Sequence, residues 1–139
     1  AVGECAGEVV SAIEFDLAAA EREIFQAQLQ LEKDQVDESA RTAYLAMIHA
    51  ARALVKVEVS EVPDDPDRIV GEFTTRFYET QKFYDPFAGG KFAQYLFAAH
   101  KAAQGPHTPD SARYLLDEAQ LFIDAAHSCY NRMSAPVPV

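Results

Sequence analysis

Apolar side chains recur at helical spacing in three long segments of the chain. Within each segment they are separated alternately by three and four positions, which places them on one face of an α-helix. Such a face is buried against neighbouring elements, so the pattern predicts three long helices. Their buried stripes are Val10, Ile13, Leu17, Ala20, Ile24, Ala27 and Leu31; then Val36, Ala40, Ala43, Met47, Ala50, Leu54 and Val57; and finally Ala112, Leu115, Ala119, Phe122, Ala126, Cys129 and Met133.

The first two stripes are out of phase with each other. Extending the first stripe past Leu31 would place Asp34 and Glu38 in the core. We therefore expect a turn between Lys33 and Asp37, with Asp34 or Asp37 as the residue that caps the second helix. Because no glycine or proline marks this turn, a single long kinked helix is the alternative.

Proline divides the middle of the chain into two shorter helical segments. Val62-Pro63 closes the second long helix, and Asp65-Pro66 reads as the cap and first position of the next. The inner face of that helix would carry Ile69, Phe73, Phe77 and Thr80. A loop or turn follows at residues 85–91, then a helix over about residues 92–103. Thr108-Pro109-Asp110 predicts the start of the last helix.

These elements predict an all-α protein, an up-down helical bundle of about five helices. A chain of 139 residues is long enough for one domain and too short for two ordinary ones. We expect residues 9–133 to form the bundle. Residues 1–8 are predicted to be an N-terminal linker, and residues 134–139, which include two prolines, a C-terminal tail.

The chain is acidic, with a formal net charge of −10. Phosphate neutralisation by basic side chains supplies most nucleic-acid affinity, so nucleic acid is an unexpected partner. Acidic charge also disfavours anionic membranes, and apolar runs such as residues 95–99 are too short to span a bilayer. Cys5 and Cys129 are typical of two reduced thiols, with a bridge between the termini as the alternative. With no signal peptide visible, we expect a cytoplasmic protein.

Reactive and metal-ligating side chains form only weak patterns. Paired Glu-x-x-His motifs hold di-iron sites in helical bundles, and the nearest match here is Asp124-x-x-His127, once. We therefore expect no metal ligands, and a helical metal-binding protein is the alternative. Cys129 lies on an apolar stripe and two residues from His127, which on a helix point in different directions. A buried structural thiol is the favoured interpretation, and no catalytic residue is predicted.

The segment Asp85-Pro-Phe-Ala-Gly-Gly-Lys91 is the most distinctive motif of the chain. It resembles a phosphate cradle, but a Walker loop needs Gly where the chain has Asp85 and Ser or Thr where it has Phe92. A tight turn between two aromatic helices is favoured, with weak anion binding as the alternative. Aromatic residues are dense around it, and part of them is expected to lie on the surface. The candidate interaction surface for a protein partner comprises Asp85, Phe87, Gly89, Gly90, Lys91 and Tyr95.

The stretch Arg41-Thr-Ala-Tyr-Leu-Ala-Met-Ile-His-Ala-Ala-Arg-Ala-Leu54, within a layout of long helices, resembles the HEPN class of helical bundles. Catalytic HEPN ribonucleases place four to six residues between an arginine and a histidine. Seven residues separate Arg41 from His49 here. The resemblance therefore implies the fold and argues against the nuclease. It leaves a nucleotide- or RNA-binding module without nuclease activity as an alternative function.

A second resemblance covers nearly the whole chain. It rests on Gly3-Glu-Cys-Ala-Gly-Glu-Val-Val10, Arg76-Phe-Tyr78, Tyr84-Asp-Pro-Phe-Ala-Gly-Gly-Lys-Phe-Ala-Gln-Tyr95 and Glu118-Ala-Gln-Leu-Phe-Ile123. Together these segments resemble a helical C-terminal extension of some bacterial nitrite/sulfite reductases of the sirohaem and iron–sulfur type. In that family the cofactors are bound upstream, and four cysteines hold the [4Fe–4S] cluster. Cys5 and Cys129 cannot supply that pattern, so no cofactor is expected in this chain.

The resemblance implies a function in assembly. We expect a non-catalytic accessory module, fused to or associated with a sulfite/nitrite reductase, which mediates assembly or docking. Sirohaem and the [4Fe–4S] cluster would belong to a reductase domain upstream or to a separate subunit. A homo-oligomer is compatible with this function.

Overall fold

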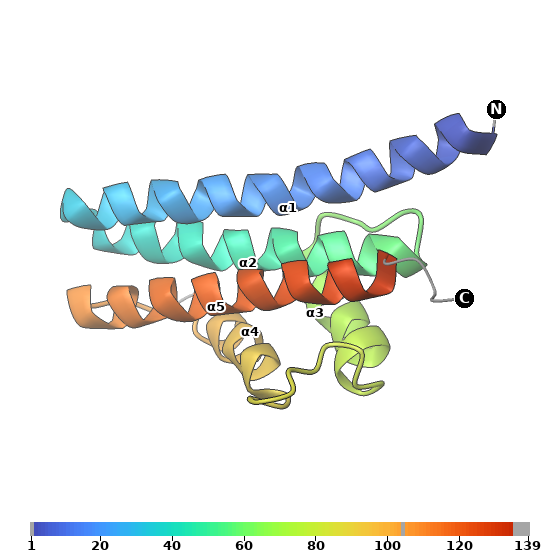
Figure 1. The fold of residues 1–139 in the computed structure, drawn as a ribbon. Helices are drawn as coiled ribbons and strands as arrows, with labels where there is room; N and C mark the ends of the chain where they lie inside the picture. The colour runs from blue at the N-terminus through green and yellow to red at the C-terminus, as the bar shows by residue number, and fades with distance from the viewer. Residues whose placement is uncertain (1, 104, 135–139) are drawn as a thin grey trace.

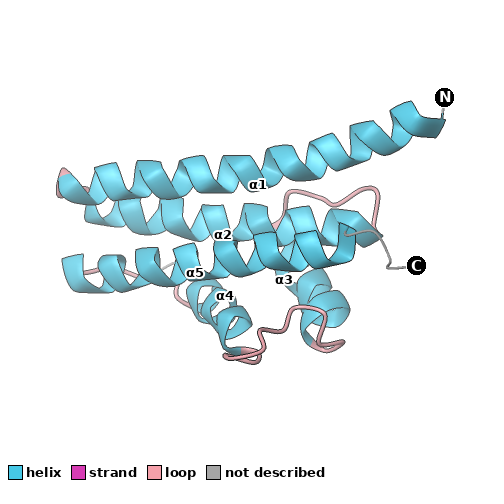
Figure 2. Cartoon of the chain, in the orientation of Figure 1, coloured by secondary structure: helices cyan, strands magenta, loops and turns pink. Residues whose placement is uncertain are grey.

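A computed structural model of the protein describes the backbone of residues 2–103 and 105–134, with side chains from residue 12 onward. Within these ranges the chain forms five α-helices and no strand, which confirms the all-α bundle (Figures 1 and 2). The helices are α1 (Val2–Glu32), α2 (Val36–Glu58), α3 (Pro66–Phe73), α4 (Lys91–Lys101) and α5 (Pro109–Ser134). A π-helical turn, η1 (Thr74–Tyr78), continues α3.

The helices are arranged in three layers (Figure 1). Helix α1 forms one outer layer, α2 and α5 form the middle, and α3, η1 and α4 lie on the other side. Helix α2 runs antiparallel to α1. Helix α5 runs in the same direction as α2, because α3 and α4 return the chain to the beginning of α2. The backbone N–H of His107, just before α5, accordingly lies 3.4 Å from Asp37 Oδ1 near the beginning of α2.

The predicted stripes form the core between these layers. Most of their positions are buried, and removing this apolar surface from water is the main favourable term in folding. Val57 is an exception, since 36% of it is exposed. A strict heptad pattern drifts by about 20° per heptad around an α-helix, so the last position of a three-heptad stripe leaves the buried face. Val55 takes its place in the core.

The turn between α1 and α2 lies where the stripes reset, but its cap differs from the prediction. Gln35 is the N-cap residue of α2 and makes no side-chain capping bond. Asp34 adopts the left-handed conformation, with φ of 59°, and so reverses the chain instead of capping it. The start of α5 fits the prediction better, because the backbone N–H of Ser111 donates to Thr108 Oγ1 at 3.1 Å.

The two ends of the bundle also differ from the predicted boundaries. Helix α1 begins at Val2, so residues 2–8 are helical where a linker was predicted. This segment contains two glycines but no proline, and glycine weakens a helix by only about 1 kcal/mol without ending it. Ser134, the first residue of the predicted tail, is the last residue of α5. Residues 1 and 135–139 lie outside the described part of the chain.

Aromatic rings fill the core beneath α3 and η1. Phe73 is its centre, because its ring lies 5.9 Å or less from the rings of Phe77, Phe83 and Phe122. Contacts between rings at such separations are favourable beyond the apolar area that they bury. Thr80, predicted on the same inner face, is exposed. The wider π turn shifts the helical phase before Thr80, and the left-handed Gln81, with φ of 62°, reverses the chain directly after it.

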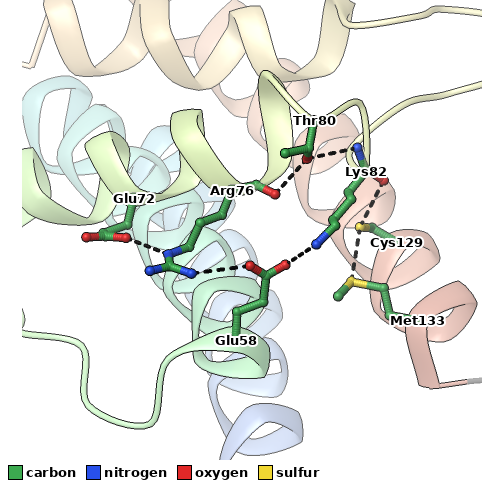
Figure 3. Close-up of polar contacts among 7 residues, drawn as sticks. All are labelled: Glu58, Glu72, Arg76, Thr80, Lys82, Cys129 and Met133. Carbon is green, nitrogen blue, oxygen red and sulfur yellow. Dashed lines mark hydrogen bonds and ion pairs between the residues drawn. The ribbon is translucent and has the colours of Figure 1, made fainter.

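Polar contacts hold the elements in register at the layer boundaries. At the end of α2, the Glu58 carboxylate lies 3.4 Å from Arg76 Nη1 and 2.6 Å from Lys82 Nζ (Figure 3). Between α1 and α2, Lys56 Nζ lies 2.5 Å from Asp16 Oδ2. The buried Ser39 hydroxyl donates to the carbonyl of Ala27 at 2.7 Å.

Candidate interaction surface

The connection from η1 to α4 contains a tight turn that Asp85 builds with its own backbone and side chain. Its backbone N–H donates to Gly89 O at 3.0 Å, and the N–H of Gly89 donates back to Asp85 O at 2.8 Å. Its carboxylate oxygen Oδ1 accepts from the N–H groups of Phe87 and Ala88, both at 2.8 Å. This is an Asx-type turn, in which a side-chain oxygen satisfies backbone donors that the loop would otherwise leave exposed.

Phe87 stands at the tip of this turn and is 99% exposed. Its side chain therefore contributes almost no buried area to this fold, while its backbone is held by Asp85. Tyr84 and Lys91, on either side of the turn, are exposed as well. A rigid turn that presents an aromatic ring to solvent has the character of an interface anchor, because little conformational entropy is lost when the ring is buried by a partner.

The other members of the predicted surface have structural roles. Gly89 adopts a left-handed conformation, with φ of 63°, which closes the turn. A Cβ atom at Gly90 would lie 3.1 Å from Cε1 of Tyr78, so glycine here lets η1 and α4 approach closely. Tyr95 is half-buried and packs against Phe92, with ring centroids 5.9 Å apart. The structure brings the six predicted residues together, but only Phe87 and Lys91 are largely free to contact a partner.

The same geometry bears on the phosphate-cradle alternative. In an anion-binding loop, backbone N–H groups point at the bound anion. Here the N–H groups of Phe87 and Ala88 are already bonded to the carboxylate of Asp85. The loop thus carries its own anion at that place, and a bound phosphate would meet a negative charge. This is the tight turn between aromatic helices that the sequence favoured.

The turn is also fixed from behind by α5. Arg132 Nη2 donates to the carbonyls of Lys82 and Tyr84, each at 3.4 Å. The thiol of Cys129 donates to the same Lys82 carbonyl at 3.4 Å (Figure 3). Burial raises the pKa of the Cys129 thiol, and the nearby Arg132 opposes this shift. Cys129 is therefore a structural thiol that packs behind the loop, as its place in the stripe predicts. The side chain of Cys5 lies outside the described residues.

An open groove of about 960 Å³ lies between α2, α4 and the beginning of α5. Alanines of α4 form part of its lining, and Tyr44 and Tyr114 line it as well. Arg41 and His107 line it together with Asp37 and Glu118, so the described lining carries both signs of charge. Such a mixture does not provide the uniform positive field that phosphate groups require.

A chain of hydrogen bonds that no local pattern predicts runs beside this groove. The Tyr44 hydroxyl and His100 Nδ1 are 2.7 Å apart, and His100 Nε2 is 2.7 Å from Asp67 Oδ1. These side chains come from α2, α4 and α3, so only the tertiary fold brings them together. Burial, and then the charge of Asp67, raise the pKa of the Tyr44 phenol. Tyr44 is therefore a neutral hydroxyl near neutral pH, and this series of hydrogen bonds ties three helices together.

Asp124 and His127, the nearest match to a metal-binding motif in the sequence, contact different neighbours. Asp124 accepts from Gln120 Nε2 at 3.0 Å, whereas His127 lies beside Glu21 of α1, with Nε2 3.1 Å from Oε1. Across the part of the chain whose side chains are described, no group of three or more His, Cys, Asp or Glu could hold a metal ion. Arg41 lines the groove, whereas His49 is absent from the groove lining and contacts Glu23 of α1.

The fold and this surface define an all-α bundle with a rigid, exposed aromatic turn. Comparison of the chain with models of known protein families finds no match, and comparison with curated proteins finds none either. None of the helices in residues 2–103 and 105–134 is both long and apolar enough to cross a lipid bilayer.

Proposed function

We propose that this chain is a non-catalytic helical module that docks on a protein partner through the turn at residues 84–91. One observation carries the proposal: Phe87 is 99% exposed on a turn whose backbone is fixed by its own hydrogen bonds. A phenyl ring in water is unfavourable, and a rigid loop that keeps it there is explained by a partner that covers it. Tyr84 extends the aromatic surface, and Lys91 adds a positive charge at its edge.

For the partner we propose a sulfite/nitrite reductase of the sirohaem and iron–sulfur type, either as a domain of the same polypeptide or as a separate subunit. Support comes from the sequence resemblance, whose longest segment, Tyr84 to Tyr95, contains the docking turn. In this proposal sirohaem and the [4Fe–4S] cluster belong to the reductase. The module would then position the reductase within an assembly, with no redox group of its own.

Calorimetric titration of the full chain into such a reductase tests the proposal. Phe87→Ala is expected to weaken binding by about 10- to 100-fold, the usual effect of truncating an interface anchor. Lys91→Glu should also weaken binding. The loss of affinity should be larger at low salt than at high salt, because salt screens the interaction of this charge with the partner. Tyr114→Ala is the matched control, because Tyr114 is also largely exposed but lies in the groove.

The possible outcomes separate the two parts of the proposal. Wild-type protein that does not bind the reductase would refute this partner. Binding that survives Phe87→Ala as well as it survives Tyr114→Ala would refute the docking turn. Circular dichroism of each variant checks that the helical fold is intact.

A further inference from the structure

Helix α1 carries a second apolar stripe on the face opposite the core. It consists of Phe15, Ala18, Arg22, Phe25 and Leu29, called the outer stripe below. Its members are separated by three, four, three and four positions, the spacing of a coiled-coil seam. Phe15 is 65% and Phe25 62% exposed, and Leu29 is also exposed. Helix α1 forms an outer layer of the bundle (Figure 1), and the exposure of these side chains places them on its solvent face.

We propose that the outer stripe is a dimer interface, in which α1 packs antiparallel against α1 of a second copy of this chain. The stripe extends over 15 residues, or about four helical turns. A heptad seam of this kind is recognised by another helix, because its side chains fit between those of a facing helix. This proposal rests on α1 alone and is independent of the docking turn.

The order of residues in the outer stripe favours a second copy as the occupant. In an antiparallel pair whose two-fold axis crosses α1 at the level of residue 20, Phe15 of one copy faces Phe25 of the other. Both pairs of rings are then buried against each other. In the same register Arg22 faces Ala18, whose small side chain leaves room for the guanidinium. A parallel pair would instead place the two Arg22 side chains against each other.

Charge complementarity supports the same register. Arg22 is the only charged member of the outer stripe, and its guanidinium carbon lies 5.7 Å from the centroid of the Phe15 ring. The exposed carboxylate of Glu14 lies on one flank of the stripe, four residues from Ala18. In the antiparallel pair each Arg22 therefore approaches Glu14 of the other copy, and a cation at an interface needs such a partner.

Sedimentation velocity of the full chain over a range of concentrations tests the interface. The wild-type protein is expected to shift from one chain to two as its concentration rises. Phe25→Glu should weaken dimerisation by on the order of 100-fold, because it places an unpaired carboxylate in the seam. Phe87→Glu is the matched control, since it makes the same chemical change at an exposed phenylalanine on the opposite side of the molecule, and it should leave the dimer intact.

A second pair of variants tests the antiparallel register. Ala18→Glu faces Arg22 of the other copy and should preserve or strengthen the dimer, whereas Ala18→Lys should weaken it about 10-fold or more. Both substitutions keep good helix formers in an exposed position, so neither should disturb the fold. A protein that stays a single chain at the highest concentration, or a dimer that tolerates Phe25→Glu, would overturn the proposal. Equal effects of Ala18→Glu and Ala18→Lys would overturn the register.

Discussion

Asp85 shows how a single side chain sets the position of another. Its carboxylate accepts two backbone N–H groups, and these bonds fix the segment that presents Phe87. The carboxylate itself points into the turn, so its contribution to binding is indirect. What the turn requires at this position is thus an acceptor oxygen and not a negative charge available to a partner.

Asp85→Ala is expected to lower the free energy of unfolding by about 1 kcal/mol, the typical net contribution of such hydrogen bonds. Affinity for the partner should fall as well, because a loosened turn must be ordered on binding. Urea unfolding and calorimetric titration measure the two effects. Asp85→Asn retains an acceptor oxygen and should keep most of the stability and most of the affinity. Full affinity in Asp85→Ala would show that binding does not depend on the hydrogen bonds of Asp85.

Cys129 illustrates a residue whose chemistry is suppressed by its surroundings. Only the thiolate of cysteine is a good nucleophile, and burial raises the pKa of this thiol. In a Cys5→Ser background, Cys129 should react with a disulfide reagent at least about 100-fold more slowly in the native protein than in urea, because reaction requires opening of the fold. Following the released chromophore measures both rates. Fast modification of the native protein would contradict a structural role.

At the scale of elements, α1 is attached to the rest of the bundle by its apolar stripe and by ion pairs. In one of these pairs, Glu23 Oε1 of α1 lies 2.6 Å from Nδ1 of His49 on α2. This hydrogen bond raises the pKa of His49 above its ordinary value of 6.5, partial burial opposes the shift, and the charges of Glu23, Asp64 and Asp16 add to it. The folded protein therefore binds the proton of His49 more tightly than the unfolded chain does.

This proton binding makes part of the stability depend on pH. The contribution of His49 is complete below the unfolded pKa and is lost as the pH rises through the higher folded pKa. Wild-type protein should thus lose about 0.5–1 kcal/mol relative to His49→Gln between pH 6 and pH 8.5, the range for a partly exposed pair. Thermal unfolding of both proteins across this range measures the difference. If the stability of the wild-type protein and of His49→Gln changed with pH in parallel, the His49–Glu23 pair would make no pH-dependent contribution to stability.

The elements were predictable because each long helix repeats its pattern over many turns. Single exceptions such as Val57 do not change the assignment of a helix that has six other stripe positions. Boundaries were less predictable, since the start of α1 at Val2 and the cap at Gln35 depend on one or two residues each. The π turn, which displaces Thr80 from the core, has no sequence signature of its own.

At the scale of the whole molecule, sequence alone identified the candidate surface and missed the contacts that join distant segments. The turn at residues 85–91 is contiguous, so its glycines and aromatics could be found in a single stretch. The hydrogen bonds from Tyr44 to His100 and from His100 to Asp67 join residues of three helices, and these residues share no sequence spacing that would connect them. The parallel course of α2 and α5 likewise follows from how the shorter helices return the chain, which periodicity does not encode.

The three-layer order has a consequence for how such a molecule would act in an assembly. Helix α1 and the connection between η1 and α4 lie on opposite sides of the α2–α5 layer (Figure 1). Two copies joined back to back along α1 would hold their aromatic tips at the far ends of the pair, facing away from each other. The two turns of such a dimer could not bind the same partner molecule. The dimer would work as a bridge that holds two partner molecules apart by the combined thickness of two bundles.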